Sequence, residues 1–193
     1  EYTDYFEGQY YDLWLSPVDD NTHLLRGSIV ISKYSCSGYW ISNGIQLYDE
    51  HGNARLTNTN DYAWNLYINN PLEDLIQPTY VSGSLKYEIV DTILENGLHA
   101  QNWKVTCKAI ENVGMNNVLI RIGCEEFYSI DDIFGDYDEE TQICTFNCII
   151  PDFYKEADYY VESLRFCDVA QNQKNYNFSD SPNQEQRIIQ TIH

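Results

Sequence analysis

The sequence is poor in basic residues and in long apolar runs, and each shortage excludes a class of protein. Lys and Arg total 11 against 30 Asp and Glu, and the resulting net charge of -19 opposes binding to a phosphate backbone. No apolar run approaches the roughly 18–20 residues of a membrane span. We therefore expect neither a nucleic-acid partner nor a membrane-spanning segment.

Blocks of Ala, Leu and Lys at helical spacing are also scarce. In their place stand 17 Tyr and frequent Ile, Val and Thr, which suit half-buried pleated surfaces. The run "QNWKVTCKAIEN" alternates Trp103, Val105, Cys107 and Ala109 on one face of an expected strand. Such runs predict an all-β chain.

The chain lacks the motifs of common catalytic and metal centres. It contains no Gly-x-Ser-x-Gly elbow, no phosphate-binding loop and no Cys-x-x-Cys pair, and its 4 His are scattered. We therefore expect no enzyme and no cofactor. The paired carboxylates of a glycosidase depend on a separation in space, so a secreted hydrolase stays open as an alternative.

The cysteines favour disulfides in an oxidising compartment, because none has zinc-binding spacing. We therefore expect an extracellular protein. Cys124 ends one expected strand and Cys144 begins another after an acidic stretch, which predicts a Cys124–Cys144 disulfide at the base of a loose connection. The prediction leaves the other cysteines without assigned partners: Cys36, Cys107, Cys148 and Cys167.

Two stretches resemble each other. Residues 39–56, "YWISNGIQLYDEHGNARL", and residues 159–176, "YYVESLRFCDVAQNQKNY", both alternate and then break at an Asp-x-x-x-Asn turn. Laying Asp49 on Asp168 gives an offset of 168 - 49 = 119. We expect a divergent tandem repeat whose matched residues are equally buried. The matched pairs are Ile29 with Cys148, Ile31 with Ile150, Ile45 with Leu164, and Leu47 with Phe166.

The chain divides by pattern into four parts. Residues 78–178 supply about seven short strands at the spacing of a β-sandwich, and residues 1–56 supply a partial unit. Residues 57–77 are expected to be a connector, with Trp64 and Tyr67 wedged between the units. Residues 179–193 are a linker or a donor strand, and their end, "RIIQTIH", is expected to add a strand to a neighbouring subunit.

Several stretches also match motifs of a known family. They are "IENVGMNNVLIRI", "CIIPDFY" and "LRFCDVAQN" in the second copy, and "IVISKY" and "IQLYDEHGN" in the first. In these the chain resembles the immunoglobulin-like tandem repeats of large secreted and cell-surface, adhesin-like proteins, although Gln171 stands where the family has Gly. The resemblance implies immunoglobulin-like antiparallel β-sandwiches, one complete and one partial, in a surface-displayed setting.

Acidic residues raise the question of Ca²⁺. Asp136, Asp138 and Glu140 are candidate ligands, but their stretch lacks the twelve-residue calcium loop, and a solvated hairpin tip is the favoured interpretation. Asp49 and Asp168 are interpreted as turn residues that bond backbone N–H groups, with half of a Ca²⁺ site as the alternative.

Asn177, in "NFS", is the one glycosylation sequon.

The sequence predicts an extracellular structural or adhesive segment of a larger or polymeric assembly, with another polypeptide as its partner. The aromatic residues Tyr5, Phe6, Tyr10, Tyr11 and Trp14 could bind a glycan or a protein, although alternation favours a core role for about half of them. A carbohydrate-binding module and a secreted immune-modulating β-sandwich stay open as alternatives. The N-terminus lacks a signal pattern and does not begin with Met, so we expect a processed form or a fragment.

Overall fold

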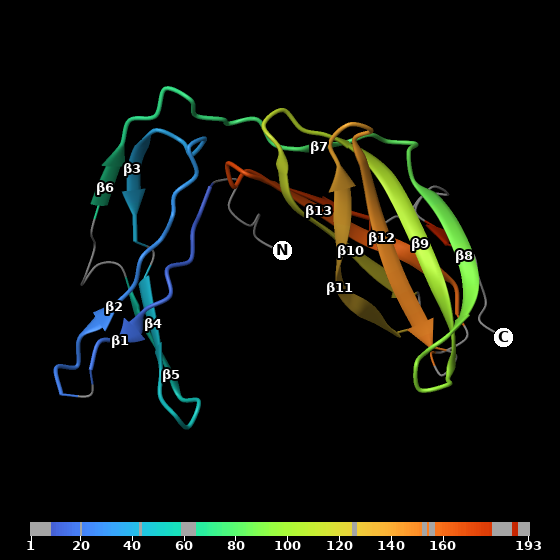
Figure 1. Cartoon of the computed structure of the whole chain (residues 1–193), viewed down its shortest axis with the longest axis horizontal. Coiled ribbons are helices and arrows are strands. Elements are labelled where there is room, and N and C mark those ends of the chain that lie inside the picture. The colour runs from blue at the N-terminus through green and yellow to red at the C-terminus, as the bar shows by residue number, and fades with distance from the viewer. Residues whose placement is uncertain are drawn as a thin grey trace.

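In the computed structural model, the chain folds into two bodies that are joined by an extended segment (Figure 1). It describes residues 9–19, 21–42, 44–58, 65–124, 127–151, 154, 157–178 and 187–188. We call the described residues up to 76 the N-terminal lobe and those from 77 onward the C-terminal body. All regular structure in these ranges is β-strand, and none of it is a helix that could cross a membrane. The predicted all-β class is confirmed.

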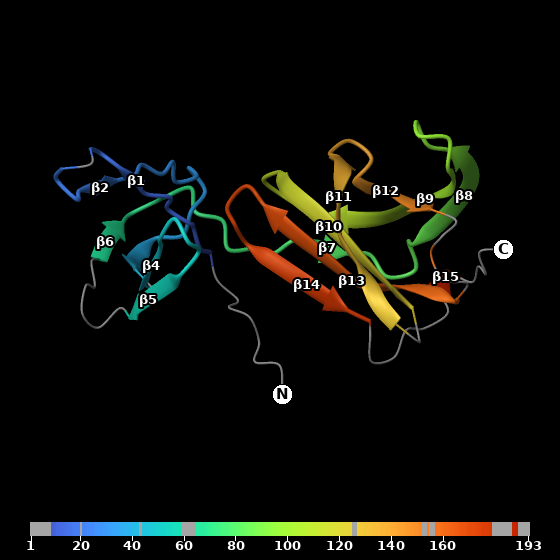
Figure 2. The same cartoon turned by 90° about the horizontal axis from the view of Figure 1, so that it is seen from below.

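The N-terminal lobe is built from short strands. They are β1 (Ser16–Pro17), β2 (Leu25–Arg26), β3 (Gly38–Ile41), β4 (Gly44–Tyr48), β5 (Ala54–Asn58) and β6 (Asn65–Ile68). They pair as separate antiparallel 2-stranded sheets, β3 with β6 (Figure 1), and β1 with β2 and β4 with β5 (Figure 2). The lobe therefore has no sheet large enough to bury a face by itself.

Two predictions for this region are corrected. Residues 27–37 form no strand, although alternation predicted one over 28–32. The expected connector contributes β6, in which Tyr67 lies opposite Tyr39 instead of between two units. Trp64 lies outside the described residues. Alternation was a poor guide here because, among the described residues, no strand pairs with residues 28–32.

The C-terminal body is one large antiparallel sheet. Its strands are β7 (Thr79–Tyr80), β8 (Lys86–Ile93), β9 (His99–Ile110), β10 (Met115–Cys124), β11 (Phe127–Asp138), β12 (Ile143–Pro151), β13 (Tyr159–Asp168), β14 (Gln173–Asn177) and β15 (Arg187–Ile188). Their order is β14-β13-β10-β11-β12-β9-β7, with β8 also on β9 and β15 also on β13. The backbone N–H of Tyr80 on β7 donates to the hydroxyl of Tyr176 on β14 at 3.1 Å, so the sheet nearly closes on itself.

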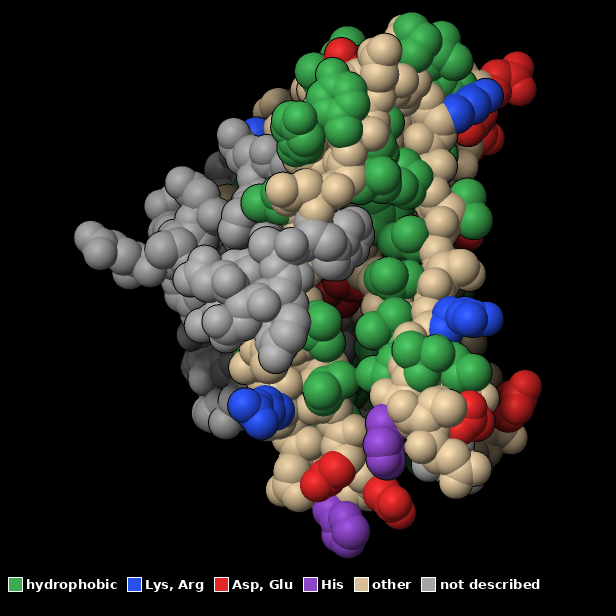
Figure 3. Space-filling model, turned by 90° about the vertical axis from the view of Figure 1, so that its left-hand side faces the viewer, with side chains coloured by type: hydrophobic (Ala, Val, Ile, Leu, Met, Phe, Trp, Pro, Cys, Tyr) green, Lys and Arg blue, Asp and Glu red, His purple; other side chains and the backbone are tan. Residues whose placement is uncertain are grey.

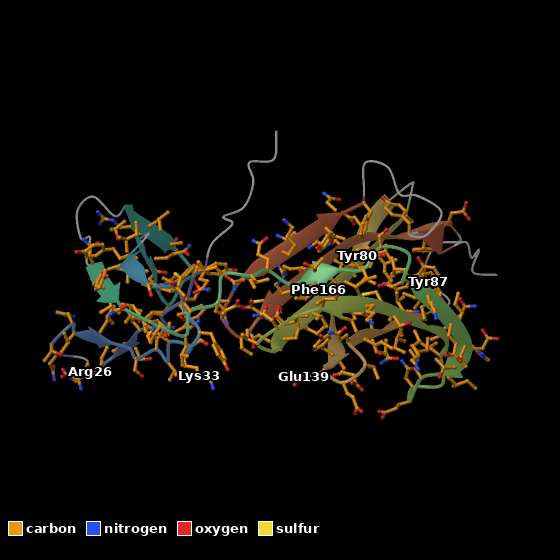
Figure 4. All side chains as sticks on the ribbon, turned by 90° about the horizontal axis from the view of Figure 1, so that it is seen from above. Arg26, Lys33, Tyr80, Tyr87, Glu139 and Phe166 are labelled. Carbon is orange, nitrogen blue, oxygen red and sulfur yellow. The ribbon has the colours of Figure 1, made fainter. Side chains whose placement is uncertain are left out.

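Alternating apolar residues of these strands fill the interior of the C-terminal body. The predicted inward face of β9 is confirmed, since Trp103 and Cys107 are 1% exposed and Val105 and Ala109 are 0% exposed. Figure 4 shows Tyr80 and Phe166 within this body, and the ring of Tyr176 lies 5.6 Å and 5.9 Å from their rings. This packing supplies the main hydrophobic stabilisation of the structure.

The acidic stretch after Cys124 is strand β11 and not a loose connection. Cys124 lies opposite Phe127 near one end of β11, and Cys144 lies opposite Tyr137 near the other. These β11 positions are 137 - 127 = 10 residues apart, or about 30 Å along a strand. A disulfide needs Cα atoms within roughly 7 Å, so the predicted Cys124–Cys144 bridge does not fit this topology.

The two copies share a hairpin. At the offset of 168 - 49 = 119, β4–β5 and β13–β14 pair in the same register, with Leu47 opposite Arg55 and Phe166 opposite Lys174. Hairpin geometry follows from the turn and the local pattern, and these are the features that the two stretches have in common.

The expected equal burial of the two copies is wrong. Leu47 is 43% exposed where Phe166 is 0% exposed, and Ile29 is 37% exposed where Cys148 is 0% exposed. Ile31 and Ile45 are half-buried, whereas their counterparts Ile150 and Leu164 are fully buried. The second hairpin belongs to a nearly closed sheet whose interior buries one of its faces, whereas no second layer among the described residues covers the first hairpin.

The prediction that the tail adds a strand to a neighbouring subunit is also corrected in part. Arg187 and Ile188 pair with Tyr160 and Tyr159 of β13 in the same chain, so these two residues are not presented to a neighbouring subunit. The remaining residues of the tail lie outside the described residues.

Candidate functional site

One aspartate builds the turn between β13 and β14. Asp168 Oδ1 accepts a hydrogen bond from the backbone N–H of Asn172, and Asp168 Oδ2 accepts one from the Asn172 side-chain amide, both at 2.8 Å. Gln171 adopts a φ of 73°, in the region that glycine enters most easily. The predicted turn role of Asp168 is confirmed by these contacts.

The same bonds recur in the first hairpin. Asp49 accepts from the backbone N–H of Asn53 at 2.9 Å and from its side-chain amide at 2.7 Å, and Gly52 holds a φ of 81°. Asp49 and Asn53 are exposed, whereas Asp168 and Asn172 are buried. One turn therefore stands free in solvent while its counterpart is covered.

Asn172 connects two segments of the lobe, which contain Gln9 and Asp74, to the C-terminal body. Its side-chain amide donates to the carbonyl oxygen of Asp74 at 3.0 Å, and its Oδ1 accepts from Gln9 Nε2 at 3.0 Å. Gln9 Nε2 also donates to the Asp74 carbonyl at 2.8 Å, and Gln173 Nε2 donates to the Tyr10 hydroxyl at 2.9 Å. The turn thus holds two separate segments of the lobe against the C-terminal body, and we call this contact the junction.

Three carboxylates meet at the junction. One oxygen each from Asp74, Glu111 and Asp168 lies within 4.8 Å of the others. Asp74 Oδ1 accepts from the Asn112 side-chain amide at 3.1 Å. Glu111 Oε1 accepts from the backbone N–H groups of Asn112 and Val113 at 2.7 and 2.8 Å, but Glu111 Oε2 is buried without a hydrogen-bond partner. The cluster is satisfied except at this one oxygen.

Burial raises the pKa of Asp168, and the negative charge of Asp74 raises it further, although hydrogen bonds from Asn172 act in the opposite direction. Burial likewise raises the pKa of Glu111, with added repulsion from Asp168 and Asp74. A carboxyl group whose pKa is higher in the folded than in the unfolded chain takes up protons on folding. The stability that it contributes is therefore greatest at acid pH and is lost as the pH rises through the raised pKa.

Asp74, Glu111 and Asp168 are the residues of this site that could hold a cation, since hard cations such as Ca²⁺ prefer carboxylate oxygens. Amide donors already engage Asp74 and Asp168, so the formation of the turn and junction accounts for their positions. We interpret the cluster as a structural contact with one unsatisfied carboxylate.

The Glu111→Gln variant should therefore be more stable than the wild type by about 1 kcal/mol at neutral pH. The amide keeps the acceptor at Oε1, removes one buried charge, and offers a donor to the neighbouring carboxylates. The gain should shrink as the pH falls, because the wild-type carboxyl group becomes protonated. Urea denaturation at several pH values measures this, with exposed Glu95→Gln as the control. A Glu111→Gln variant that is less stable at neutral pH would contradict it.

A cleft of about 710 Å³ opens beside the junction. Its lining residues are Gln9, Cys36, Leu75, Gln77, Pro78, Thr79, Asn172, Lys174 and Tyr176. Gln9 Oε1 accepts from the backbone N–H of Cys36 at 2.6 Å, so the lobe forms one wall of the cleft. None of the lining residues is an acid or a histidine, so the cleft offers no general base of these types.

The predicted calcium candidates lie elsewhere. Asp136, Asp138 and Glu140 are exposed on β11 and on the turn after it. Asp138 Oδ1 accepts from the backbone N–H groups of Glu140 and Thr141 at 2.9 Å each, and the bond from Thr141 lowers the pKa of Asp138. Within the described residues these three acids do not form a metal-type cluster. The favoured hairpin-tip interpretation agrees with the placement of Asp138 and Glu140, whereas Asp136 lies within β11 opposite Thr145.

The other candidate residues are dispersed. Trp14 is 83% exposed and Tyr10 is 48% exposed, so a core role is wrong for Trp14, whereas the Tyr11 ring packs 5.3 Å from the ring of Trp40. Tyr5 and Phe6 lie outside the described residues. Asn177 is exposed at the end of β14, and Ser179 of the sequon lies outside the described residues.

Sequence reasoning missed Asp74, Glu111 and Gln9. The contact between Asp74 and Asn172 spans 98 positions, and the contact between Gln9 and Asn172 spans 163. No local period or motif marks such contacts.

Comparison with known proteins finds no matching family model, no matching curated protein and no matching solved structure.

Proposed function

We propose that the chain is an extracellular, non-enzymatic structural or adhesive segment of a larger or polymeric assembly, and that the N-terminal lobe is its assembly surface. The observation that carries this proposal is the large amount of exposed apolar surface on the lobe (Figure 3). Its exposed large apolar residues are Tyr10, Leu13, Trp14, Leu15, Val18, Leu24, Leu25, Ile29, Val30, Tyr39, Ile41, Leu47, Tyr48, Leu56, Leu66, Tyr67, Leu72, Leu75 and Ile76.

The contrast between the two bodies supports this. The buried apolar residues of the described chain all lie between Pro78 and Ala170. In the lobe, the buried residues are the polar Ser35 and Asp74. Extended apolar patches on a soluble protein mark interaction sites, so the lobe needs a partner to cover it.

The partner that we propose is a second copy of this chain. Two copies that each carry a net charge of -19 repel one another across most of their surface. Strands β3, β4 and β6, with the sequences GYWI, GIQLY and NLYI, contain no charged residue. They offer a place where two acidic chains can approach, and each has one edge without a ladder partner within the described residues.

The strand order supports a finer proposal for the C-terminal body, namely an immunoglobulin-like sandwich. Such domains place strands A-B-E-D in one layer and C-F-G in the other. Here β8-β9-β12 and the end of β11 follow the first order, and β10-β13-β14 follow the second. An extracellular location fits this type of domain, and Asn177 would then be available for glycosylation.

The Ile41→Asp variant should remain monomeric under conditions in which the wild type associates. Ile41 is 65% exposed on β3, so the new charge leaves the fold intact but must be desolvated in any contact through this sheet. Sedimentation velocity at micromolar concentrations measures the change. Ile93→Asp is the matched control, because Ile93 is also 65% exposed but lies on β8 of the C-terminal body. A monomeric wild type, or equal effects of the two variants, would refute the proposal.

The carbohydrate-binding alternative has one observation in its favour. Tyr39 and Tyr67 are 74% and 60% exposed, and their rings lie 5.0 Å apart. Their planes are inclined at 59°, so the two rings cannot both lie flat on one sugar face. A glycan array with wild type and Tyr67→Ala tests this alternative.

A further inference from the structure

Strands β9 and β12 place two cysteines directly opposite each other. Cys107 and Cys144 are register partners, and the ladder runs without a shift from Lys108–Ile143 to Ala100–Pro151. Both side chains belong to the core, with exposures of 1% and 0%. We propose that Cys107 and Cys144 form a disulfide when the protein folds in an oxidising environment.

The ladder fixes the backbone geometry of this pair. The backbone N–H of Ala109 donates to the carbonyl oxygen of Gln142 at 3.0 Å, so these two opposed residues form a hydrogen-bonded pair. Cys107 and Cys144 lie two positions further along an unshifted ladder and form a pair of the same kind. Such pairs have Cα atoms about 5.5 Å apart, within the roughly 4.4–6.8 Å that disulfides span.

In the strand registers, none of the other cysteines lies opposite a cysteine. Cys148 lies opposite Trp103, Cys124 lies opposite Phe127 and Tyr159, and Cys167 lies opposite Asn117 and Gln173. Cys36 belongs to the lobe and lines the cleft at the junction. The register therefore singles out Cys107 and Cys144 as the one pair of cysteines that are direct neighbours across a ladder.

The oxidation requires a disulfide reagent such as oxidised glutathione. Each cysteine thiol loses one proton and one electron as the S–S bond forms, and the reagent takes up two protons and two electrons to give two thiols. Both sulfurs are buried in the folded chain, so exchange must take place before the ladder between β9 and β12 is complete. The bond closes a loop over residues 108–143, which carries β10 and β11.

Peptide mapping tests the pairing on the unaltered chain. The protein is refolded with oxidised and reduced glutathione, alkylated in denaturant without reductant, and digested with trypsin and chymotrypsin. Trypsin isolates Cys107 in residues 105–108, and chymotrypsin isolates Cys144 in residues 138–146. The expected result is a linked pair of these peptides. Alkylated Cys107 and Cys144, or bridges from either to another cysteine, would overturn the proposal.

Thermal unfolding gives an independent readout. The oxidised wild type should unfold about 10 °C above the reduced wild type, because the bond restricts the unfolded chain. The Cys148→Ala variant should keep this difference, since it loses a core side chain on β12 that faces Trp103. The Cys107→Ala/Cys144→Ala variant should lose it. An equal difference in all three proteins would contradict the assignment. If a variant fails to fold, the peptide mapping of the wild type decides the pairing by itself.

Discussion

Replacing Asn172 with Asp should destabilise the protein by about 3–5 kcal/mol at neutral pH, the cost typical of an uncompensated buried charge. The variant loses the amide that donates to Asp168 and to the Asp74 carbonyl, and it adds a fourth carboxylate beside Asp74, Glu111 and Asp168. Urea denaturation at neutral pH measures the loss. Part of the stability should return as the pH falls, because protonation removes the repulsion.

The matched control is Asn53→Asp. Asn53 makes the same contacts with Asp49 in the first hairpin, but the turn there is exposed. Repulsion between exposed carboxylates is screened by water and salt, so this change should cost less than about 1 kcal/mol. Equal losses in the two variants would show that the turn itself, and not the buried junction, determines the effect.

Replacing Phe166 with Ala should destabilise the C-terminal body by about 3–5 kcal/mol, whereas Leu47→Ala should cost less than about 1 kcal/mol. The two residues occupy the same place in the repeated hairpin. Phe166 is 0% exposed and packs against Tyr176, so its removal leaves a cavity, while Leu47 is 43% exposed.

Chemical denaturation of both variants at low protein concentration checks this difference. Dilution matters because association through the lobe could bury Leu47. A loss above about 2 kcal/mol for Leu47→Ala in a monomeric protein would mean that the lobe has a core of its own.

Local features of the structure could be predicted from the sequence. The alternation from Trp103 to Ala109 places the inward face of β9, because side chains in a strand repeat every two residues. The Asp168 turn was also predictable, since its hydrogen bonds join residues at most four positions apart.

Strand β11 could not be predicted from the sequence. Its acidic residues concealed the alternation of Ile133, Gly135 and Tyr137, which are half-buried, with exposed neighbours. Asp132 is held on the exposed face by Arg121 at 2.8 Å and Arg165 at 3.4 Å, from strands β10 and β13. These arginines belong to strands whose order in the sheet is not encoded locally. Without β11, the two flanking cysteines were wrongly assigned to one another.

The junction has a consequence for biosynthesis. Chains are made from the N-terminus, so the apolar lobe leaves the ribosome before the hairpin that holds it. Its contacts with Asn172 must wait for residues made 98 and 163 positions later. At typical synthesis rates the delay is about 5–30 s. During this interval the nascent lobe is exposed to chaperones and to neighbouring nascent chains, so the order of synthesis gives other copies the first opportunity to bind it.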